Sequence, residues 1–387
     1  MSNNFINTLG IDLSIGKVKL CLLSLDKENK FITGAWTSLP VEFEYIDEKN
    51  YEFSKGLSIA IEAFLKHHNL NVESIKSTIF CTGGAYYMFK SFIDGLIYTA
   101  SVLKMIFNRQ KVYFIRCDGK LFKLREIFDI SEKEASAFNS TNFLGTSILA
   151  TKIFDEGLAI DMGTISTSII PIINREIDPN AKLNPSGYTK HRYITGKHIW
   201  YGSMHTPLNY ITTSVKTNKG FYNLILRSCS TNTLCNILGI LPSSVANVHV
   251  SNKNSKIQDD DNLSYIQMAE TLGLDIYSIS KEELYEVAKN IYYIMIYKLS
   301  EIIRNIVNNT NFSSFENLKV LSCGLGQNAF IVPALLNAGF DKSQIITIEE
   351  DKESNLWTAT SVYGLAIKAM EDIIKEPLNV DFKDLNS

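Results

Sequence analysis

The first forty residues alternate between apolar runs and short polar turns. FINTLGIDL, VKLCLLSL and FITGAWTSL each have the pattern of a strand, and SIGK and DKENK separate them. Glycine and charged residues in such short connections favour tight turns between antiparallel strands. The chain therefore opens on a three-stranded meander with no helix after its first glycine. This order disfavours a Rossmann unit, and the phosphate-loop pattern GxxxxGK[ST] occurs nowhere in the sequence.

Beyond the meander, apolar positions recur with helical spacing in some segments and form short strand-like runs in others. We predict helices over about 54–68, 86–107, 131–154, 281–309 and 355–375. STIFCT, KVYFIRC, NLKVLSC and SQIITIEE have the pattern of buried strands. WYGSMHTPL, at residues 200–208, is turn-like.

The opening unit occurs a second time. GLAIDMG and TSIIPIINREI form another strand–turn–strand pattern, and GIDLSIGKVKL aligns with AIDMGTISTSI when Asp12 is placed on Asp161. The offset is 149 residues (161 minus 12). Two such units, each opening a mixed region, predict an α/β protein with the duplicated actin-like (ribonuclease H-like) fold and an interdomain cleft. The alternative is a chance likeness of two short apolar strands.

We place the two domains at residues 1–150 and 151–387, because 387 residues exceed the usual size of one core. Polar insertions are expected in the second domain at about 174–200 and 251–263. The net charge of -3 gives no reason to expect nucleic-acid binding. No apolar run approaches the roughly 20 residues of a membrane span, and the N-terminus lacks the signal-peptide pattern. We therefore expect a cytoplasmic protein without a membrane partner.

Phosphates bind between the two hairpins in a fold of this type, where turn amides donate and a carboxylate holds Mg²⁺. Asp12 and Asp161 stand at the strand ends where such carboxylates are needed, and we predict them as catalytic and metal-binding residues. We predict Lys19 as a third catalytic residue, because it can reach a phosphate as a point charge. Three turn residues would let the backbone approach the ligand, namely Gly16, Gly163 and Thr164. The plainer interpretation is that the two aspartates only cap turns.

Further candidates follow other strands. Gly324 and Gly326 lie between a strand and a helix start, where a sugar, a base or another anion can bind. We predict substrate contacts at Thr82, Gly83, Asp118, His205 and Thr206. The six cysteines form no CxxC pair and the histidines no HExxH pattern, so we expect buried thiols and no dedicated zinc site.

These motifs resemble the hydantoinase/oxoprolinase-related branch of the actin-like superfamily, from about Gly10 to Phe330. Within that branch the chain looks like tetrahydromethanopterin-linked one-carbon transfer proteins and the methanofuran-pathway synthase. The matching positions are Asp12, Lys19, Thr82, Gly83, Asp118, Gly119, Asp161, Gly163, Thr167, Thr206, Pro207, Gly324 and Gly326. The resemblance implies phosphate contacts from Thr167 as well.

Several positions depart from the family pattern. Ser14 and Ile15 replace two glycines, and Gly84, Ser168 and His205 replace a glutamate, an aspartate and an arginine. Such losses weaken the handling of metal and diphosphate, because arginine holds phosphate as a bidentate fork and histidine cannot.

Three functions are therefore open. The resemblance implies a Mg²⁺-dependent transferase that joins a diphosphate-activated aminomethylfuran to a tyramine-derived phenol and releases diphosphate. The second is an ATP-dependent small-molecule kinase of the same fold. The third is a diverged, non-catalytic binding or assembly protein. The first two take a small-molecule substrate, and the sequence leaves homo- and hetero-oligomers open.

Overall fold

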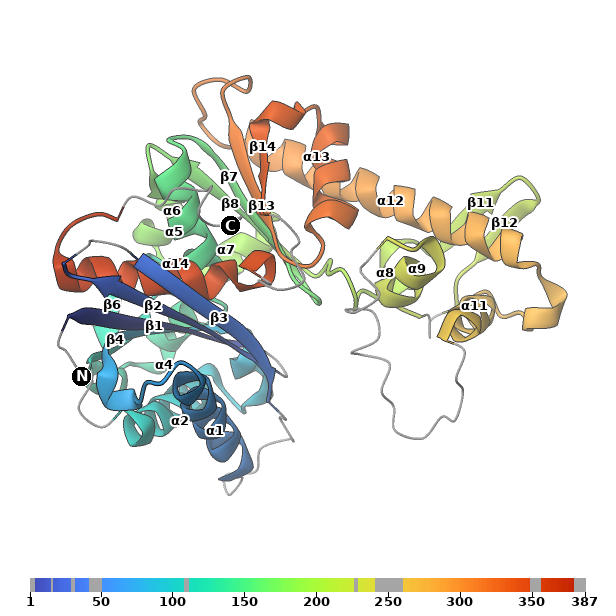
Figure 1. The fold of residues 1–387 in the computed structure, drawn as a ribbon. Helices are drawn as coiled ribbons and strands as arrows, with labels where there is room; N and C mark the ends of the chain where they lie inside the picture. The colour runs from blue at the N-terminus through green and yellow to red at the C-terminus, as the bar shows by residue number, and fades with distance from the viewer. Residues whose placement is uncertain are drawn as a thin grey trace.

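The computed structural model describes residues 4–14, 17–28, 32–41, 51–107, 111–225, 229–240, 260–348 and 356–378. Gly16 and most of the expected insertion at 251–263 lie outside these ranges. Two mixed sheets form the body of the protein, with helices between them and on their outer faces (Figure 1).

The first sheet contains the predicted meander. Its strand order is β3-β2-β1-β4-β5-β6, with β1 antiparallel to β2 and parallel to β4. The strands are β1 (Phe5–Ser14), β2 (Lys17–Asp26), β3 (Ile32–Pro40), β4 (Ile75–Gly83), β5 (Lys111–Ile115) and β6 (Leu121–Lys123).

The second sheet repeats this arrangement around β7. Its order is β10-β8-β7-β13-β14, with β7 antiparallel to β8 and parallel to β13, and β9 pairs with β8. The strands are β7 (Gly157–Met162), β8 (Thr167–Ile173), β9 (Glu176–Ile177), β10 (His198–Ile199), β13 (Lys319–Cys323) and β14 (Ile345–Thr347). The duplicated fold predicted from the repeat is therefore confirmed.

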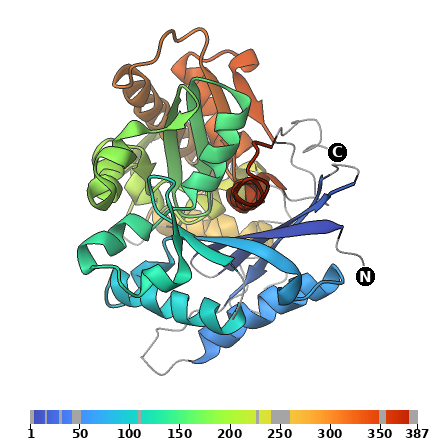
Figure 2. The ribbon, with the colours of Figure 1, turned by 90° about the vertical axis from the view of Figure 1, so that its left-hand side faces the viewer.

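Two helices lie between the sheets, α5 (Phe143–Ile153) and α14 (Leu356–Ile374). Figure 2 shows α14 end-on between them. Their apolar side chains join the inner faces of both sheets in one core. The outer face of the first sheet packs on α1 (Tyr51–His67) and α2 (Phe92–Ile106). The outer face of the second packs on α12 (Lys281–Asn308) and α13 (Val332–Ala338).

The backbones of α5 and α14 touch. A Cβ atom on Gly145 would lie 1.6 Å from the carbonyl oxygen of Ser361, and one on Gly364 would lie 1.9 Å from that of Gly145. No side chain fits at either contact. Two glycines therefore set the distance between the central helices.

The N-terminal half of α12 packs against a further group of elements (Figure 1). These are α8 (Leu208–Ile211), α9 (Thr231–Leu238), α11 (Asp260–Thr271) and the hairpin of β11 (Ser214–Thr217) and β12 (Gly220–Asn223). Among the described helices, none is both long and apolar enough to cross a membrane.

Two helix predictions need correction. The predicted helix 131–154 is broken: α4 (Glu132–Ala135) and a 3-10 turn precede α5, and Ser140 in between has φ +52°. The predicted helix 86–107 begins only at Phe92, where the Ser91 hydroxyl caps it.

Residues 174–200 contain β9, α6 (Pro179–Leu183), α7 (Pro185–Ile194) and β10. In the first half of the chain, α3 (Leu124–Ile127) follows β6.

Candidate phosphate-binding site

The two predicted aspartates occupy equivalent places in the two sheets. Asp12 in β1 is paired with Lys19 in β2 and with Cys81 in β4. Asp161 in β7 is paired in the same way with Ser168 in β8 and Cys323 in β13. The internal repeat therefore places both carboxylates on the inner faces of the sheets, next to the central helices.

Each aspartate also lies against a glycine at the end of the neighbouring parallel strand, Gly83 as the last residue of β4 and Gly324 as the residue after β13. A Cβ atom on Gly83 would lie 3.3 Å from Oδ1 of Asp12, and one on Gly324 would lie 2.4 Å from Oδ1 of Asp161. Gly324 has φ +84°, which favours glycine in any case. The absence of a side chain at these two positions leaves room for the carboxylates.

Asp12 is fully buried and both of its oxygens have partners. Ser14 Oγ donates to Oδ1 at 3.2 Å, and Ser361 Oγ on α14 donates to Oδ2 at 2.9 Å. Lys19 Nζ lies 3.8 Å from Oδ2. Since a buried carboxylate needs donors and an opposite charge, these contacts account for its burial. Asp12 is therefore held in place by two hydroxyl groups and a lysine.

Asp161 is more accessible. It is half-buried, and Thr146 Oγ1 on α5 donates to its Oδ2 at 3.4 Å. Burial raises the pKa of this carboxyl, and the charge of Asp12 raises it further, while Lys19, Thr146 and Lys17 oppose the shift. Asp161 is therefore the carboxylate that remains available to a ligand.

Lys17 and Lys19 of β2 lie on the same face of the sheet, because side chains two residues apart on a strand point the same way. Burial lowers the pKa of Lys19, but Asp12 and Asp161 outweigh it and the net shift is upward. Burial and the charge of Lys19 lower the pKa of Lys17 to about 8. Together with the two aspartates, the lysines make the cluster formally neutral, which suits an anion that brings its own cation.

The residues fit Mg²⁺ only when it arrives with phosphate. In the described part of the chain, no three His, Cys, Asp or Glu residues come together as a metal cluster. Mg²⁺ usually keeps several waters and binds through one or two carboxylates and the phosphates of the substrate. Asp161 offers one such carboxylate, and Lys17 and Lys19 would repel a cation that came alone.

The 200–208 segment holds the β7–β8 turn through backbone hydrogen bonds. Ser203 N donates to Gly163 O at 3.0 Å, and Met204 N and His205 N donate to Thr164 O at 3.1 and 2.9 Å. The amides of Thr164 and Ile165 have no acceptor among the described residues. Backbone amides in a turn can form an anion-binding concavity where they point to one side.

Three of the predicted site hydroxyls serve the fold. Thr82 Oγ1 donates to Phe138 O at 3.2 Å and accepts from Ser140 N. Thr167 Oγ1 donates to Tyr201 O, and Thr206 Oγ1 donates to Gly202 O within its own turn. The structure thus brings Asp12, Lys19, Asp161, Gly83 and Gly324 together, and gives these three hydroxyls internal partners.

The remaining predicted residues are spread out. Asp118 is held by Arg116 through two hydrogen bonds of 3.0 and 2.7 Å; burial raises the pKa of Asp118, but these contacts outweigh it and the net shift is downward. The His205 side chain is exposed. Gly326 N donates to Met162 O at 3.1 Å, which holds the glycine turn against the end of β7.

The departures from the family motif have structural correlates. Gly84 has φ +92°, so a glutamate there would be strained. The Ser168 hydroxyl accepts from Nη2 of the buried Arg192 at 2.8 Å. Position 168 is therefore a contact of α7.

Sequence reasoning missed several residues of the site. Lys17 could have been found, because it lies two residues before Lys19 on the same strand. Thr146, Thr360 and Ser361 gave no signal, because no local pattern marks a helix hydroxyl as the partner of a carboxylate on a strand. Ser361 lies 349 residues from Asp12, and Thr146 lies 15 residues from Asp161. Only the fold brings them to the carboxylates.

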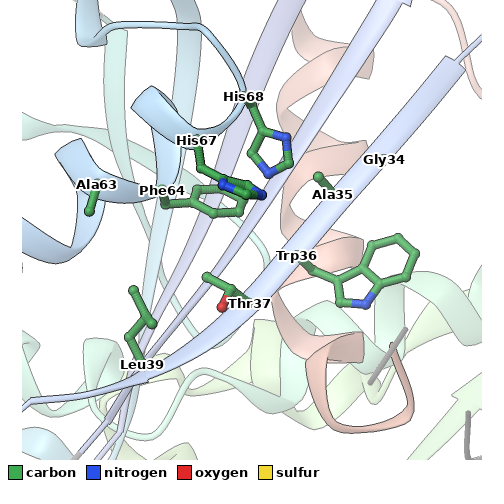
Figure 3. Close-up of a pocket in the computed structure, with 9 residues that line it drawn as sticks. All are labelled: Gly34, Ala35, Trp36, Thr37, Leu39, Ala63, Phe64, His67 and His68. Atoms are coloured by element: carbon green, nitrogen blue, oxygen red, sulfur yellow. The ribbon is translucent and has the colours of Figure 1, made fainter. Parts of the chain in front are cut away.

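A separate cavity of about 470 Å³ lies between β3 and the end of α1 (Figure 3). Its lining residues include Trp36, Thr37, Phe64, His67 and His68; His67 is the last residue of α1 and His68 follows it. None of the predicted site residues lines it.

No protein-family model and no curated protein matches the chain. Among solved structures, the nucleotide-free structure of acetone carboxylase aligns with a TM-score of 0.50 and 9% identity, over 94% of this chain and 70% of that one. The two chains share the duplicated, two-domain actin-like fold.

Component A of (R)-2-hydroxyglutaryl-CoA dehydratase from Acidaminococcus fermentans aligns with a TM-score of 0.44 and 13% identity, over 95% and 99% of the two chains. A reductive activator for a corrinoid, iron–sulfur protein aligns with a TM-score of 0.42 and 12% identity, over 100% and 66%. Neither alignment reaches a TM-score of 0.5, so function rests on the site.

Proposed function

We propose that this protein binds a nucleotide, with ATP as the first candidate, together with Mg²⁺ between the paired ends of β1 and β2 and the β7–β8 turn. The protein then cleaves or transfers the terminal phosphoryl group of that nucleotide. The observation that carries the proposal is the paired arrangement of Asp12 and Asp161. They occupy equivalent sheet positions, with Lys17 and Lys19 on the same face.

Each residue has a role that follows from its place. Lys19 and Lys17 neutralise phosphate oxygens, and the amides of Thr164 and Ile165 donate to them. Asp12 holds Lys19 in position. Asp161 would hold Mg²⁺ directly or through water, and the bound ion would stabilise charge on the phosphates. Positioning and charge neutralisation of this kind account for most of the catalysis of phosphoryl transfer.

A narrower activity uses the same site. The family resemblance supports transfer of an aminomethylfuran group from its diphosphate to a tyramine-derived phenol, as in methanofuran synthesis. A diphosphate carries the same oxygen chemistry as the end of a nucleotide, so Lys17, Lys19 and Asp161 would bind it in the same way. Release of diphosphate from that substrate would distinguish this activity from the use of ATP.

A turnover assay tests the proposal. The protein is incubated with ATP and Mg²⁺, or with the aminomethylfuran diphosphate and its acceptor, and released phosphate and diphosphate are measured. We expect turnover with one of them that falls at least about 100-fold in Asp161→Asn, because charge stabilisation in the transition state is lost. No turnover with either, or equal turnover in the variant, would overturn the catalytic part of the proposal and leave a binding protein.

A further inference from the structure

Helix α14 presents two consecutive hydroxyl groups to the two halves of the site. Ser361 Oγ donates to Asp12 of the first sheet at 2.9 Å. Thr360 Oγ1 lies 3.2 Å from Thr146 Oγ1 on α5, and Thr146 Oγ1 donates to Asp161 of the second sheet at 3.4 Å. The three hydroxyl-bearing residues are at most 1% exposed.

The donors in this chain can be assigned. Each hydroxyl carries one proton, so Thr146, which donates to Asp161, must accept from Thr360 if the two are bonded. Thr360 Oγ1 also lies 3.3 Å from Cys323 Sγ, and the Cys323 thiol donates to Ile160 O at 3.4 Å. Every proton of these described hydroxyl and thiol groups thus has an acceptor, and the charged acceptors among them are Asp12 and Asp161.

The helix contact fixes where these hydroxyls lie. The backbones of α5 and α14 meet at Gly145, Ser361 and Gly364, next to Thr146 and Thr360. Because no side chain separates the helices there, Thr146 on α5 and Thr360 on α14 come within hydrogen-bond distance of each other. The orientation of both carboxylates is therefore tied to one helix crossing.

We infer that Thr146, Thr360 and Ser361 are positioning residues, which orient Asp161 and Asp12 for the binding of Mg²⁺ and phosphate. This inference rests on the proposed function. Removal of the Thr146 hydroxyl and removal of the Ser361 hydroxyl have different consequences. Loss of the Thr146 hydroxyl frees Asp161, the carboxylate available to Mg²⁺. Loss of the Ser361 hydroxyl frees Asp12, which holds Lys19 against the phosphates.

Calorimetric titration of the full chain with ADP, with and without Mg²⁺, tests the inference. Thr146→Val keeps the shape of the side chain and removes the hydroxyl, and Thr146→Ser keeps the hydroxyl. We expect Thr146→Val to raise the Mg²⁺ concentration for half-maximal binding about tenfold, the effect of one lost hydrogen bond to a charged group. Binding of ADP without Mg²⁺ should be unchanged, and Thr146→Ser should behave as the unaltered protein.

Ser361→Ala should instead weaken ADP binding about tenfold with or without Mg²⁺, since it acts through Lys19. Its matched control is Ser147→Ala, a buried serine of α5 whose hydroxyl donates only to Phe143 O of its own helix. Normal titrations of Thr146→Val and Ser361→Ala, beside binding by the unaltered protein, would overturn the inference alone. Absence of binding by the unaltered protein would overturn the proposed function and this inference with it.

Discussion

Asp12 and Lys19 form an ion pair in which the aspartate is fully buried and the lysine nearly so. Removing one partner of such a pair leaves an uncompensated charge in the interior. We expect Lys19→Met to lower the free energy of unfolding by about 3 kcal/mol, measured by urea denaturation. The double variant Asp12→Asn with Lys19→Met removes both charges and should recover most of this loss. A Lys19→Met protein as stable as the unaltered one would contradict the pairing.

Lys17 should make phosphate affinity depend on pH near neutrality. Its pKa of about 8 means that the positive charge is present below that pH and lost above it. We expect ADP affinity, measured by calorimetry, to fall as the pH rises from about 7 to about 9. Lys17→Arg keeps its charge and should remove this dependence. Equal pH profiles for the two proteins would count against a role of Lys17.

Stability should change with pH in the opposite direction. The pKa of Lys17 is lower in the folded chain than its ordinary 10.5, so the unfolded chain binds more protons between about 8 and 10.5. The contribution of Lys17 to stability therefore increases as the pH rises through this range, even as phosphate affinity falls.

At the scale of elements, the α5–α14 contact holds the two halves together. Gly145→Ala would place its methyl group 1.6 Å from the Ser361 carbonyl oxygen, so the helices would have to separate. We expect a loss of at least about 3 kcal/mol in the free energy of unfolding, the upper range for overpacking in a core. Gly56→Ala in α1 is the matched control, because its methyl group meets Val41 at an ordinary 3.6 Å. A mild effect of Gly145→Ala would show that the helices are not held this closely.

The elements also show what sequence patterns can predict. The meander, the repeat around Asp161 and the long helix α12 follow from local periodicity, and the structure confirms them. The sequence does not predict the break in the helix 131–154, because Ser140 adopts a positive φ that its residue type does not indicate. The contact of Ser361 with Asp12 spans 349 residues of chain and that of Thr146 with Asp161 spans 15. Both depend on helix packing, which no local pattern encodes.

At the scale of the whole molecule, the last described helix, α14, covers the inner face of the first sheet. Helix α14 follows the second sheet in the sequence, yet its residues Val362 and Ala366 meet Gly10 of β1, and Thr8 donates to Ala366 O. A chain ending at residue 355 would expose the inner face of β1, β2 and β4. We expect it to lose cooperative thermal unfolding, measured by circular dichroism, whereas a chain ending at Leu378 should keep it. Cooperative unfolding of the shorter chain would show that α14 is dispensable.

The placement of the division at residue 150 remains a prediction. Because α14 packs on the first sheet, residues 1–150 without it are not expected to fold alone.

The central claim, a phosphate site built on the paired aspartates, is tested most directly by calorimetric titration of the full-length protein and Asp161→Asn with ATP. We predict that the unaltered protein binds ATP in a Mg²⁺-dependent way and that Asp161→Asn loses the Mg²⁺ dependence while keeping its melting temperature. No binding of ATP by the unaltered protein, or the same Mg²⁺-dependent binding in Asp161→Asn, would contradict it.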